Sequence, residues 1–291
     1  MIKRPGEKMS KSIEVLIKTV WKEEQIPEKW NKGELTSIWK GKGDREQLVN
    51  HRGITVSSSF GTILEEHIDK EIEKTVPFTQ AQGGGKRGAS TCDHLFILRA
   101  VIDIALKQKR PTYLTFFDVS KAFDNVDVDD MLVTIWEKGL KGKIWRILKN
   151  MSQKQKATIK TRFGKTRDID MEIGGKQGSR LTGRMFSKMM DLLAEEVGES
   201  EEGFQIARDF IIGVLLWVDD VVTCADGIEN QKKMLQRVSE FAMDHKLKWG
   251  QEKCKVLQIG KQGEQKEWNL GETRIETSRS NTYLDDKITC E

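Results

Sequence analysis

The chain has 291 residues, 37% of them hydrophobic and 32% charged, and this composition excludes a disordered or collagen-like protein. Lys and Arg number 49 against 45 Asp and Glu, a net charge of +4, and the longest apolar run, 210–218, is too short to cross a bilayer. No secretory signal is visible, and the four cysteines form no C-x-x-C pair. We therefore expect an intracellular protein without a membrane span, a zinc finger or a disulfide framework.

Hydrophobic periodicity predicts the elements in chain order. In the first part of the chain it predicts helices over 10–24, 60–76 and 91–106, a strand over 35–39 and a glycine-rich loop over 80–90. Further on it predicts strands over 112–117, 157–162, 211–218, 221–224 and 255–259, and helices over 127–139, 143–151, 182–197 and 231–245. Because no regular βαβ period appears, the pattern favours an α+β fold over a doubly wound sheet.

Charge is unevenly distributed along the chain. Residues 138–167 contain eleven Lys or Arg and no acid, whereas residues 168–229 contain fourteen acids and five bases. A long basic stretch with aromatic residues inside it is typical of surfaces that bind phosphates, although a solvated helix face would also account for it. The basic stretch therefore favours a nucleic-acid partner.

Three aspartates follow strand-like segments. Asp118 comes directly after a buried-looking strand, and Asp219 and Asp220 separate two β-rich runs at hairpin spacing. Carboxylates at adjoining strand ends can share two divalent ions, for which Mg²⁺ is suited by its preference for oxygen ligands. Asp-Asp is also an ordinary turn dipeptide, so only its place between the strands makes this pair informative.

Two other patterns are rejected. The segment GGGKRGAS (83–90) lacks the Ser or Thr that follows the lysine of a phosphate-binding P-loop, and no strand precedes it. The four histidines lie in unrelated settings and indicate no hydrolase triad, and His94 is expected to serve its own helix.

The ordered motifs resemble those of reverse transcriptases, and in particular the non-LTR (LINE-type) retrotransposon branch. The motifs are FFDVSKAFD, GGKQGSRLTGRMFSKMMD, WVDD and KCKVLQIG, with WKGKGDREQLVNHRGITVSSSFGTILEE and GKRGASTCDHLFILRAVID upstream and YLDDKIT downstream. Several motifs in the same order are far more specific than any single one.

The resemblance implies a right-hand polymerase fold. Its fingers and its palm, a small antiparallel sheet packed on helices, would be present, and its thumb missing. The expected domains are a helical extension (1–34), fingers (35–111), a palm (112–262, within which 125–172 is an alternative part of the fingers) and the truncated start of a thumb connection (263–291).

The resemblance also implies RNA-directed DNA polymerase activity, in which dNTPs are added to a primer 3′-hydroxyl by two-metal-ion catalysis. Mg²⁺ is the expected cofactor, replaceable by Mn²⁺, and an RNA template, a DNA primer and dNTPs are the expected partners. The chain would be part of a longer polyprotein with endonuclease and thumb regions, and no membrane partner is expected.

The resemblance assigns roles to individual residues. Asp118, Asp219 and the carbonyl of Val119 would hold the metal ions, and Asp220 would be an accessory catalytic acid. The residues expected to contact the nucleotide are Lys42, Arg52, Val119, Phe123 as a steric gate against a 2′-hydroxyl, Gln177, Gly178 and Lys255.

Some positions depart from the family pattern. Trp217 replaces a Tyr or Phe, Gly53 replaces a Pro, Gly83–Gly85 replace a Gly-Phe-Arg type sequence, and Asp285 replaces a Gly. These departures leave a catalytically inactive, nucleic-acid-binding retrotransposon remnant as the alternative. An RNA-templated RNA polymerase is disfavoured by Phe123.

Overall fold

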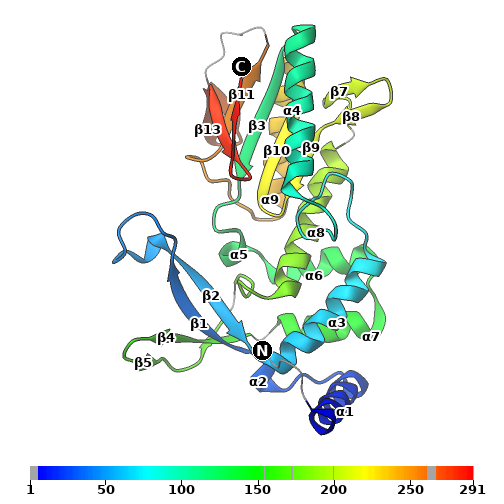
Figure 1. The fold of residues 1–291 in the computed structure, drawn as a ribbon, viewed down its shortest axis with the longest axis vertical. Helices are drawn as coiled ribbons and strands as arrows, with labels where there is room; N and C mark the ends of the chain where they lie inside the picture. Colours follow the sequence, from blue (N-terminus) through cyan, green and yellow to red (C-terminus); the bar gives the residue numbers. More distant parts are fainter. Residues whose placement is uncertain (1–5, 154, 172, 199, 261–266, 291) are drawn as a thin grey trace. The chain divides into compact units, whose positions relative to one another are not determined.

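The computed structural model describes residues 6–153, 155–171, 173–198, 200–260 and 267–290. Contacts divide the chain into two compact units, Met1–Pro77 with Phe123–Met185 and Phe78–Ala122 with Phe186–Glu291 (Figure 1). Both units combine helices and strands, which confirms the expected mixture of the two. Of the helices in the described ranges, none is long and apolar enough to cross a membrane.

The first unit is built on a sheet with the strand order β2-β1-β4-β5, in which β6 also pairs with β4. Strands β1 and β4 run parallel, and the other pairs are antiparallel. The elements of this unit are α1 (Glu7–Glu23), α2 (Glu28–Asn31), β1 (Lys32–Trp39), the 3-10 helix Leu48–Asn50, β2 (His51–Ser57), α3 (Ser59–Thr75), α6 (Val128–Glu137), α7 (Gly142–Ser152), β4 (Lys156–Thr161), β5 (Gly164–Lys165) and β6 (Ile169–Asp170).

Helices supply most of the first unit's core. In α3 the residues Leu64, Ile68 and Ile72 recur every four positions and are fully buried. Residues with the same spacing lie on one face of a helix, so α3 presents a continuous apolar stripe. Met131 of α6 and Ile147 of α7 are also fully buried.

The second unit is built on a six-stranded sheet with the order β12-β13-β11-β3-β10-β9. Two hairpins, β7/β8 and β14/β15, stand outside it. Helices α5 (Ala122–Asn125) and α8 (Arg180–Val197) run from one unit into the other. The elements are α4 (Thr91–Gln108), β3 (Thr112–Asp118), β7 (Phe204–Ala207), β8 (Phe210–Ile212), β9 (Val214–Trp217), β10 (Asp220–Asp226), α9 (Ile228–Asp244), β11 (Lys255–Ile259), β12 (Glu267–Leu270), β13 (Thr273–Ser278), β14 (Ser280–Tyr283) and β15 (Asp286–Thr289).

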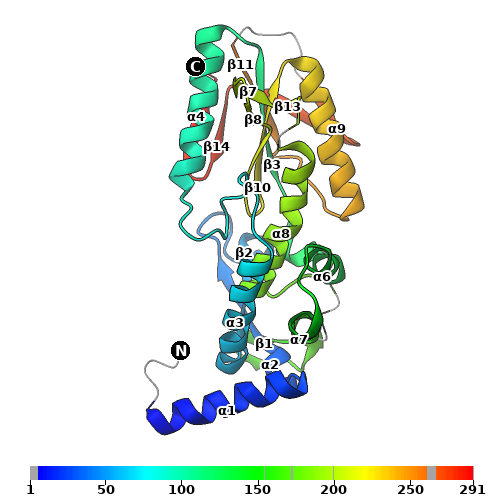
Figure 2. The ribbon, with the colours of Figure 1, turned by 90° about the vertical axis from the view of Figure 1, so that its right-hand side faces the viewer.

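Strand β3 is buried on both faces, because helices cover both sides of its sheet. Helices α4 and α9 lie on opposite sides of the strands in Figure 2. Leu114 and Phe116 of β3 belong to the core that includes Leu98 of α4. From the other face, Thr115 accepts a hydrogen bond of 2.5 Å from Gln231 of α9. This double cover explains why β3 reads as a continuous apolar run in the sequence.

The structure corrects two expectations and adds a strand that was not predicted. The sheet of the second unit is not wholly antiparallel, since β11 and β13 run parallel. The run 211–218 is split at Gly213, where a Cβ atom would stand 1.8 Å from the Val197 carbonyl oxygen, so only β9 forms the hairpin with β10. Strand β2 is not predicted from the sequence, because its alternation of apolar and polar residues is weak. It pairs with β1 along its whole length.

A buried ion pair links α3 to α8 within the first unit. The guanidinium of Arg184 donates hydrogen bonds of 2.6 and 3.1 Å to the two carboxylate oxygens of Asp69. Their side chains are only 10% and 12% exposed. Such a pair is costly to break by removing one partner, because the other charge stays buried and uncompensated.

We predict that Asp69→Ala lowers the free energy of unfolding by about 3 kcal/mol, because it strands the Arg184 charge. The double variant Asp69→Leu/Arg184→Met should lose less. Urea denaturation measures both, with Glu7→Ala as the control, since the Glu7–Lys11 pair is exposed and contributes less than about 1 kcal/mol. Equal losses for the single and double variants would contradict this account.

Candidate active site

Three aspartates meet at one end of the sheet in the second unit. Strands β3 and β10 pair antiparallel with Asp118 directly opposite Asp220. Strands β9 and β10 form a tight hairpin in which Trp217 faces Asp220, so Val218 and Asp219 make the turn. The register therefore confirms the expected hairpin but shifts its turn by one residue, from Asp219–Asp220 to Val218–Asp219, and it places all three aspartates at the same sheet end.

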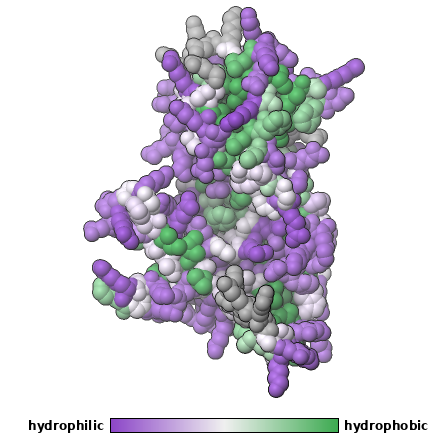
Figure 3. All heavy atoms as spheres, in the orientation of Figure 1, coloured by the Kyte–Doolittle hydropathy of each residue, from purple (hydrophilic) through white to green (hydrophobic). Residues whose placement is uncertain are grey.

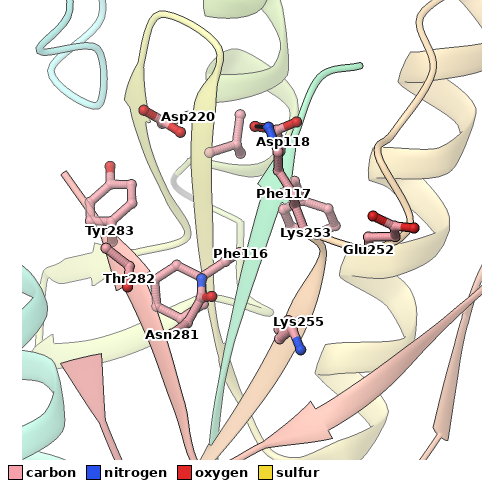
Figure 4. Close-up of a pocket in the computed structure, with 11 residues that line it drawn as sticks. Phe116, Phe117, Asp118, Asp220, Glu252, Lys253, Lys255, Asn281, Thr282 and Tyr283 are labelled. Carbon is pink, nitrogen blue, oxygen red and sulfur yellow. Dashed lines mark hydrogen bonds and ion pairs between the residues drawn. The ribbon is translucent and has the colours of Figure 1, made fainter. Parts of the chain in front are cut away.

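A pocket of about 280 Å³ opens beside these acids. Asp118 and Asp220 line it together with residues of β14, among them Tyr283, and of the segment before β11. In Figure 4, Asp220 lies on the β10 side and Asp118 on the β3 side, with Lys253 beside Asp118. Lys255 lines the same pocket but lies well apart from Asp118 in that view.

The site concentrates negative charge. Burial raises the pKa of Asp220 to about 6, and the negative charges of Asp219 and Asp118 add to the rise. The positive charge of Lys253 lowers the pKa of Asp220 in turn. The Lys253 ammonium lies 2.7 Å from the Asp118 carboxylate. The sequence prediction had chosen Lys255 and had not considered Lys253.

The chemistry of the donors fits a hard divalent cation, but their present arrangement does not form a complete metal site. Carboxylate oxygens are the ligands that Mg²⁺ prefers, and burial together with the neighbouring acids Asp219 and Asp118 raises the pKa of Asp220. Among the described residues, however, no group of three His, Cys, Asp or Glu side chains could hold a metal ion together. Lys253 occupies the position of a counter-cation at Asp118.

The backbone after β3 is fixed by a bridge between Val119 and Trp249. The Ser120 amide donates to the Lys248 carbonyl, and the Gly250 amide donates to the Asp118 carbonyl, at 2.7 and 2.8 Å. Both bonds belong to neighbours of Val119, so the bridge does not use the Val119 carbonyl. A Cβ atom on Gly250 would come within 3.2 Å of Asp118 Oδ2, so the glycine leaves room for this carboxylate.

Gln82 holds the turn that carries Asp219. Its side chain is fully buried, and its Oε1 accepts hydrogen bonds from the amides of Gly84 (2.9 Å) and Val218 (3.3 Å). Val218 has a φ of +60°, which a β-branched residue rarely adopts. The hydrogen bond that the Val218 amide donates to Gln82 therefore supports a strained backbone next to a predicted catalytic acid. Sequence reasoning missed Gln82, because it lies in a loop without periodicity.

The glycines at 83 and 84 have a structural reason. A Cβ atom at Gly83 would stand 2.7 Å from both His94 Nε2 and the Trp217 ring, and one at Gly84 would stand 2.5 Å from the Val218 amide nitrogen. The departure from the family pattern at these positions thus accompanies the departure at Trp217. The glycines let the loop approach the hairpin closely.

His94 does not serve its own helix, contrary to expectation. Its imidazole packs edge-on against Trp217 and lies 3.3 Å from the Tyr283 hydroxyl. Burial lowers the pKa of His94 to about 4, so the ring is neutral at physiological pH. The contact joins α4 to the wall of the pocket.

The remaining predicted residues lie in the first unit. The Thr55 amide of β2 donates to the Gln177 carbonyl at 2.9 Å, and the Gly175 amide donates to the Phe123 carbonyl at 2.8 Å. A Cβ atom at Gly178, whose φ is +109°, would stand 3.3 Å from the Thr55 carbonyl oxygen. The loop 174–179 thus connects Phe123 to β2. Arg52 is exposed on β2, and Lys42 is exposed in the loop that follows β1.

The family described as reverse transcriptase (RNA-dependent DNA polymerase) matches residues 40–284. The chain belongs to this family.

Within the reverse transcriptase family, the curated relatives of the chain are proteins of non-LTR retrotransposons. The Retrovirus-related Pol polyprotein from type-1 retrotransposable element R2 of Popillia japonica is 27% identical over 74% of this chain and 30% of its own length. The protein of the same name from Nasonia vitripennis is 26% identical over 66% of this chain and 18% of its length. The Transposon TX1 uncharacterized 149 kDa protein of Xenopus laevis is 21% identical over 77% and 18%. The chain thus spans less than a third of the length of these relatives.

Solved structures agree on the fold. A telomerase from Candida tropicalis in complex with the TWJ fragment of telomeric RNA matches 96% of this chain and 47% of its own, with a TM-score of 0.61 and 15% identity. The apo telomerase from the same organism matches 98% and 52%, with a TM-score of 0.61 and 13% identity. At these identities the likeness concerns the fold alone.

We predict that Gly84→Ala destabilises the protein by about 2 kcal/mol or more, because its methyl group meets backbone rather than a movable side chain. Thermal and urea unfolding measure the loss. Gly183→Ala is the matched control, because it lies within α8 with open space around its Cα and should be neutral or stabilising. Equal stability of the Gly84 variant and wild type would contradict the close approach.

The raised pKa of Asp220 predicts a pH dependence in metal-free protein. A carboxyl whose pKa rises from 3.8 to about 6 on folding binds its proton more tightly in the folded state, so its contribution to stability is lost as pH rises from about 4 to about 6. Asp220→Asn cannot ionise, so its stability relative to wild type should increase across this range. Urea unfolding in chelator at pH 4 and pH 7 measures the difference, and a constant difference would refute the assignment.

Proposed function

We propose that this chain is the RNA-directed DNA polymerase domain of a non-LTR retrotransposon protein, adding dNTPs to the 3′-hydroxyl of a DNA primer on an RNA template. The observation that carries the proposal is the register of β3 against β10, which sets Asp118 opposite Asp220 with Asp219 on the adjoining turn. Membership of the reverse transcriptase family supports the same reaction.

Asp118 and Asp219 would hold two Mg²⁺ ions, with the Val119 carbonyl as a further ligand and Asp220 as an accessory acid. When bound, such ions lower the pKa of an attacking hydroxyl and neutralise charge on the leaving pyrophosphate. Asp118 presents its carboxylate at the end of a strand that is fixed on both faces. Lys253 would have to leave its position 2.7 Å from Asp118 Oδ1 before an ion is bound there. Either Lys253 or Lys255 would then be available to the phosphates.

The nucleotide would be contacted by residues of the first unit as well. Phe123 would stand under the sugar as a gate against a 2′-hydroxyl. Gln177 and Gly178 would lie beside the base and template, and Lys42 and Arg52 would face the triphosphate. The bond between Gln177 and Thr55 supports a shared position for the loop 174–179 and the strand that carries Arg52.

The proposal assigns a fingers role to the first unit and a palm role to the second. The expected boundaries at 35, 112 and 263 follow the order of motifs, whereas the contact-based units break at 77, 122 and 185. The two sets of boundaries differ because residues 123–185, which follow β3 in the chain, belong to the first unit, where their strand β4 pairs with β1. The polymerase domain would belong to a longer polyprotein, as in the R2 relatives.

We predict that Asp219→Ala abolishes extension of a DNA primer annealed to an RNA template in the presence of dNTPs and Mg²⁺. The loss should be on the order of a thousandfold, because a bound metal ion contributes several kcal/mol to transition-state stabilisation. Gel analysis of labelled primer measures it. Asp209→Ala is the matched control, since Asp209 is an exposed acid in the turn between β7 and β8.

The alternative is a catalytically inactive remnant that still binds nucleic acid. The contact between Lys253 and Asp118 favours it, because it places a cation where a metal would bind. Wild-type protein that binds the primer–template duplex in a salt-sensitive manner, yet extends no primer with Mg²⁺ or Mn²⁺, would establish the remnant and refute the polymerase.

A further inference from the structure

Part of the charge of the basic stretch 138–167 is neutralised within the first unit. Arg146 binds Glu24, Lys156 lies 3.5 Å from Glu28, and Lys160 and Lys165 both bind Glu34. These four of the eleven cations in the stretch therefore bind acids of the N-terminal elements. Other cations of the stretch lie over aromatic rings, and one of these pairs is at the tip of the β4/β5 hairpin.

Phe163 is the aromatic ring at this tip. It is 87% exposed, more than any other large hydrophobic side chain in the described ranges. The guanidinium of Arg162 lies 4.8 Å from its ring centroid. In Figure 3, hydrophobic atoms sit among hydrophilic ones at the end of the projection where Figure 1 places β4 and β5. An exposed ring alone is unremarkable, so its setting decides the interpretation.

The turn that carries Phe163 is held by hydrogen bonds of Thr161. Thr161 faces Gly164 across the hairpin, leaving Arg162 and Phe163 as the two turn residues. The Thr161 hydroxyl accepts a hydrogen bond from the Phe163 amide at 3.2 Å and donates one to the Gly164 carbonyl at 3.0 Å. A ring displayed by a fixed backbone loses little conformational entropy when a ligand stacks on it.

The hairpin is strongly positive. Residues 160–167 contain four cations and no acid. Glu34 contacts both lysines of this set, while Arg162 and Arg167 form no ion pair with another described residue. One acid against four cations leaves an excess of about three positive charges. A fitting ligand must therefore be anionic and must also offer a flat apolar face.

We propose that the tip of the β4/β5 hairpin binds single-stranded nucleic acid, with an unpaired base stacked on Phe163 and phosphates held by Arg162, Lys165 and Arg167. Single strands expose both base faces and phosphates, whereas a duplex hides its base faces within the stack. An acidic peptide offers charge without regularly spaced rings. The inference rests on the proposed function, because single-stranded RNA template is the polynucleotide that such a domain meets.

Fluorescence anisotropy with a labelled, unstructured RNA 12-mer tests the hairpin. Phe163→Ala should weaken binding about fivefold or more, since stacking on one aromatic contributes on the order of 1–3 kcal/mol per base. Phe163→Tyr keeps the ring and should bind within about twofold of wild type, since either aromatic face can stack a base. Phe96→Ala is the matched control, since Phe96 is 74% exposed on α4 of the other unit, and it should bind as wild type. Melting curves check that each variant is folded.

Two further arms separate the sources of binding. The same sequence as DNA should show the same loss on Phe163→Ala, and a blunt RNA duplex should show none. Arg167→Gln should lower the slope of log K against log salt by about 0.7, because one phosphate contact is lost on a single strand. Unchanged RNA affinity of Phe163→Ala, or an equal loss for the duplex, would overturn the proposal.

Failure of this inference can be told from failure of the proposed function. If the wild-type chain extends no primer but Phe163→Ala weakens single-strand binding, the hairpin site stands and the polymerase does not. If the wild-type chain extends primers and Phe163→Ala binds RNA as wild type, the hairpin site alone is refuted.

Discussion

Repulsion among three carboxylates is the constraint on which the second unit depends. Antiparallel pairing sets Asp118 against Asp220, and the hairpin adds Asp219, so like charges are forced together by backbone hydrogen bonds. Such an arrangement persists only if the backbone cannot relax. Burial of β3 between α4 and α9 supplies that rigidity, while Lys253 supplies partial compensation in charge. The free energy of packing is thus used to hold an electrostatically unfavourable site.

The turn beside Asp219 is likewise an unfavourable conformation that surrounding contacts hold in place. Val218 keeps a left-handed backbone that a β-branched residue disfavours, and Gln82 and the glycines of the neighbouring loop surround it. Strained residues that are fixed by several independent contacts are characteristic of functional sites. Here the contacts come from residues more than a hundred positions earlier in the chain, so the turn is a product of tertiary structure.

Local patterns were sufficient to predict the acids but not their support. Asp118 and the pair Asp219–Asp220 could be found because apolar strands flank them, and the α+β character followed from the alternation of periods. Lys253 was missed because the turn before β11 folds back through hydrogen bonds from the Lys253 and Cys254 amides to the Gly250 carbonyl, which periodicity does not reveal. The ion pairs that neutralise part of the basic stretch could not be predicted either, because Glu24 and Glu34 are remote from it in sequence.

The close approach of Gly83 and Gly84 to Trp217 also bears on how this chain could have diverged from relatives. A side chain at Gly83 requires the large indole or the His94 ring to move, and a smaller ring at 217 would leave an unfilled gap against His94. Single steps in either direction pass through a clash or a cavity. Gly83 and Trp217 are therefore expected to change together when such a chain diverges.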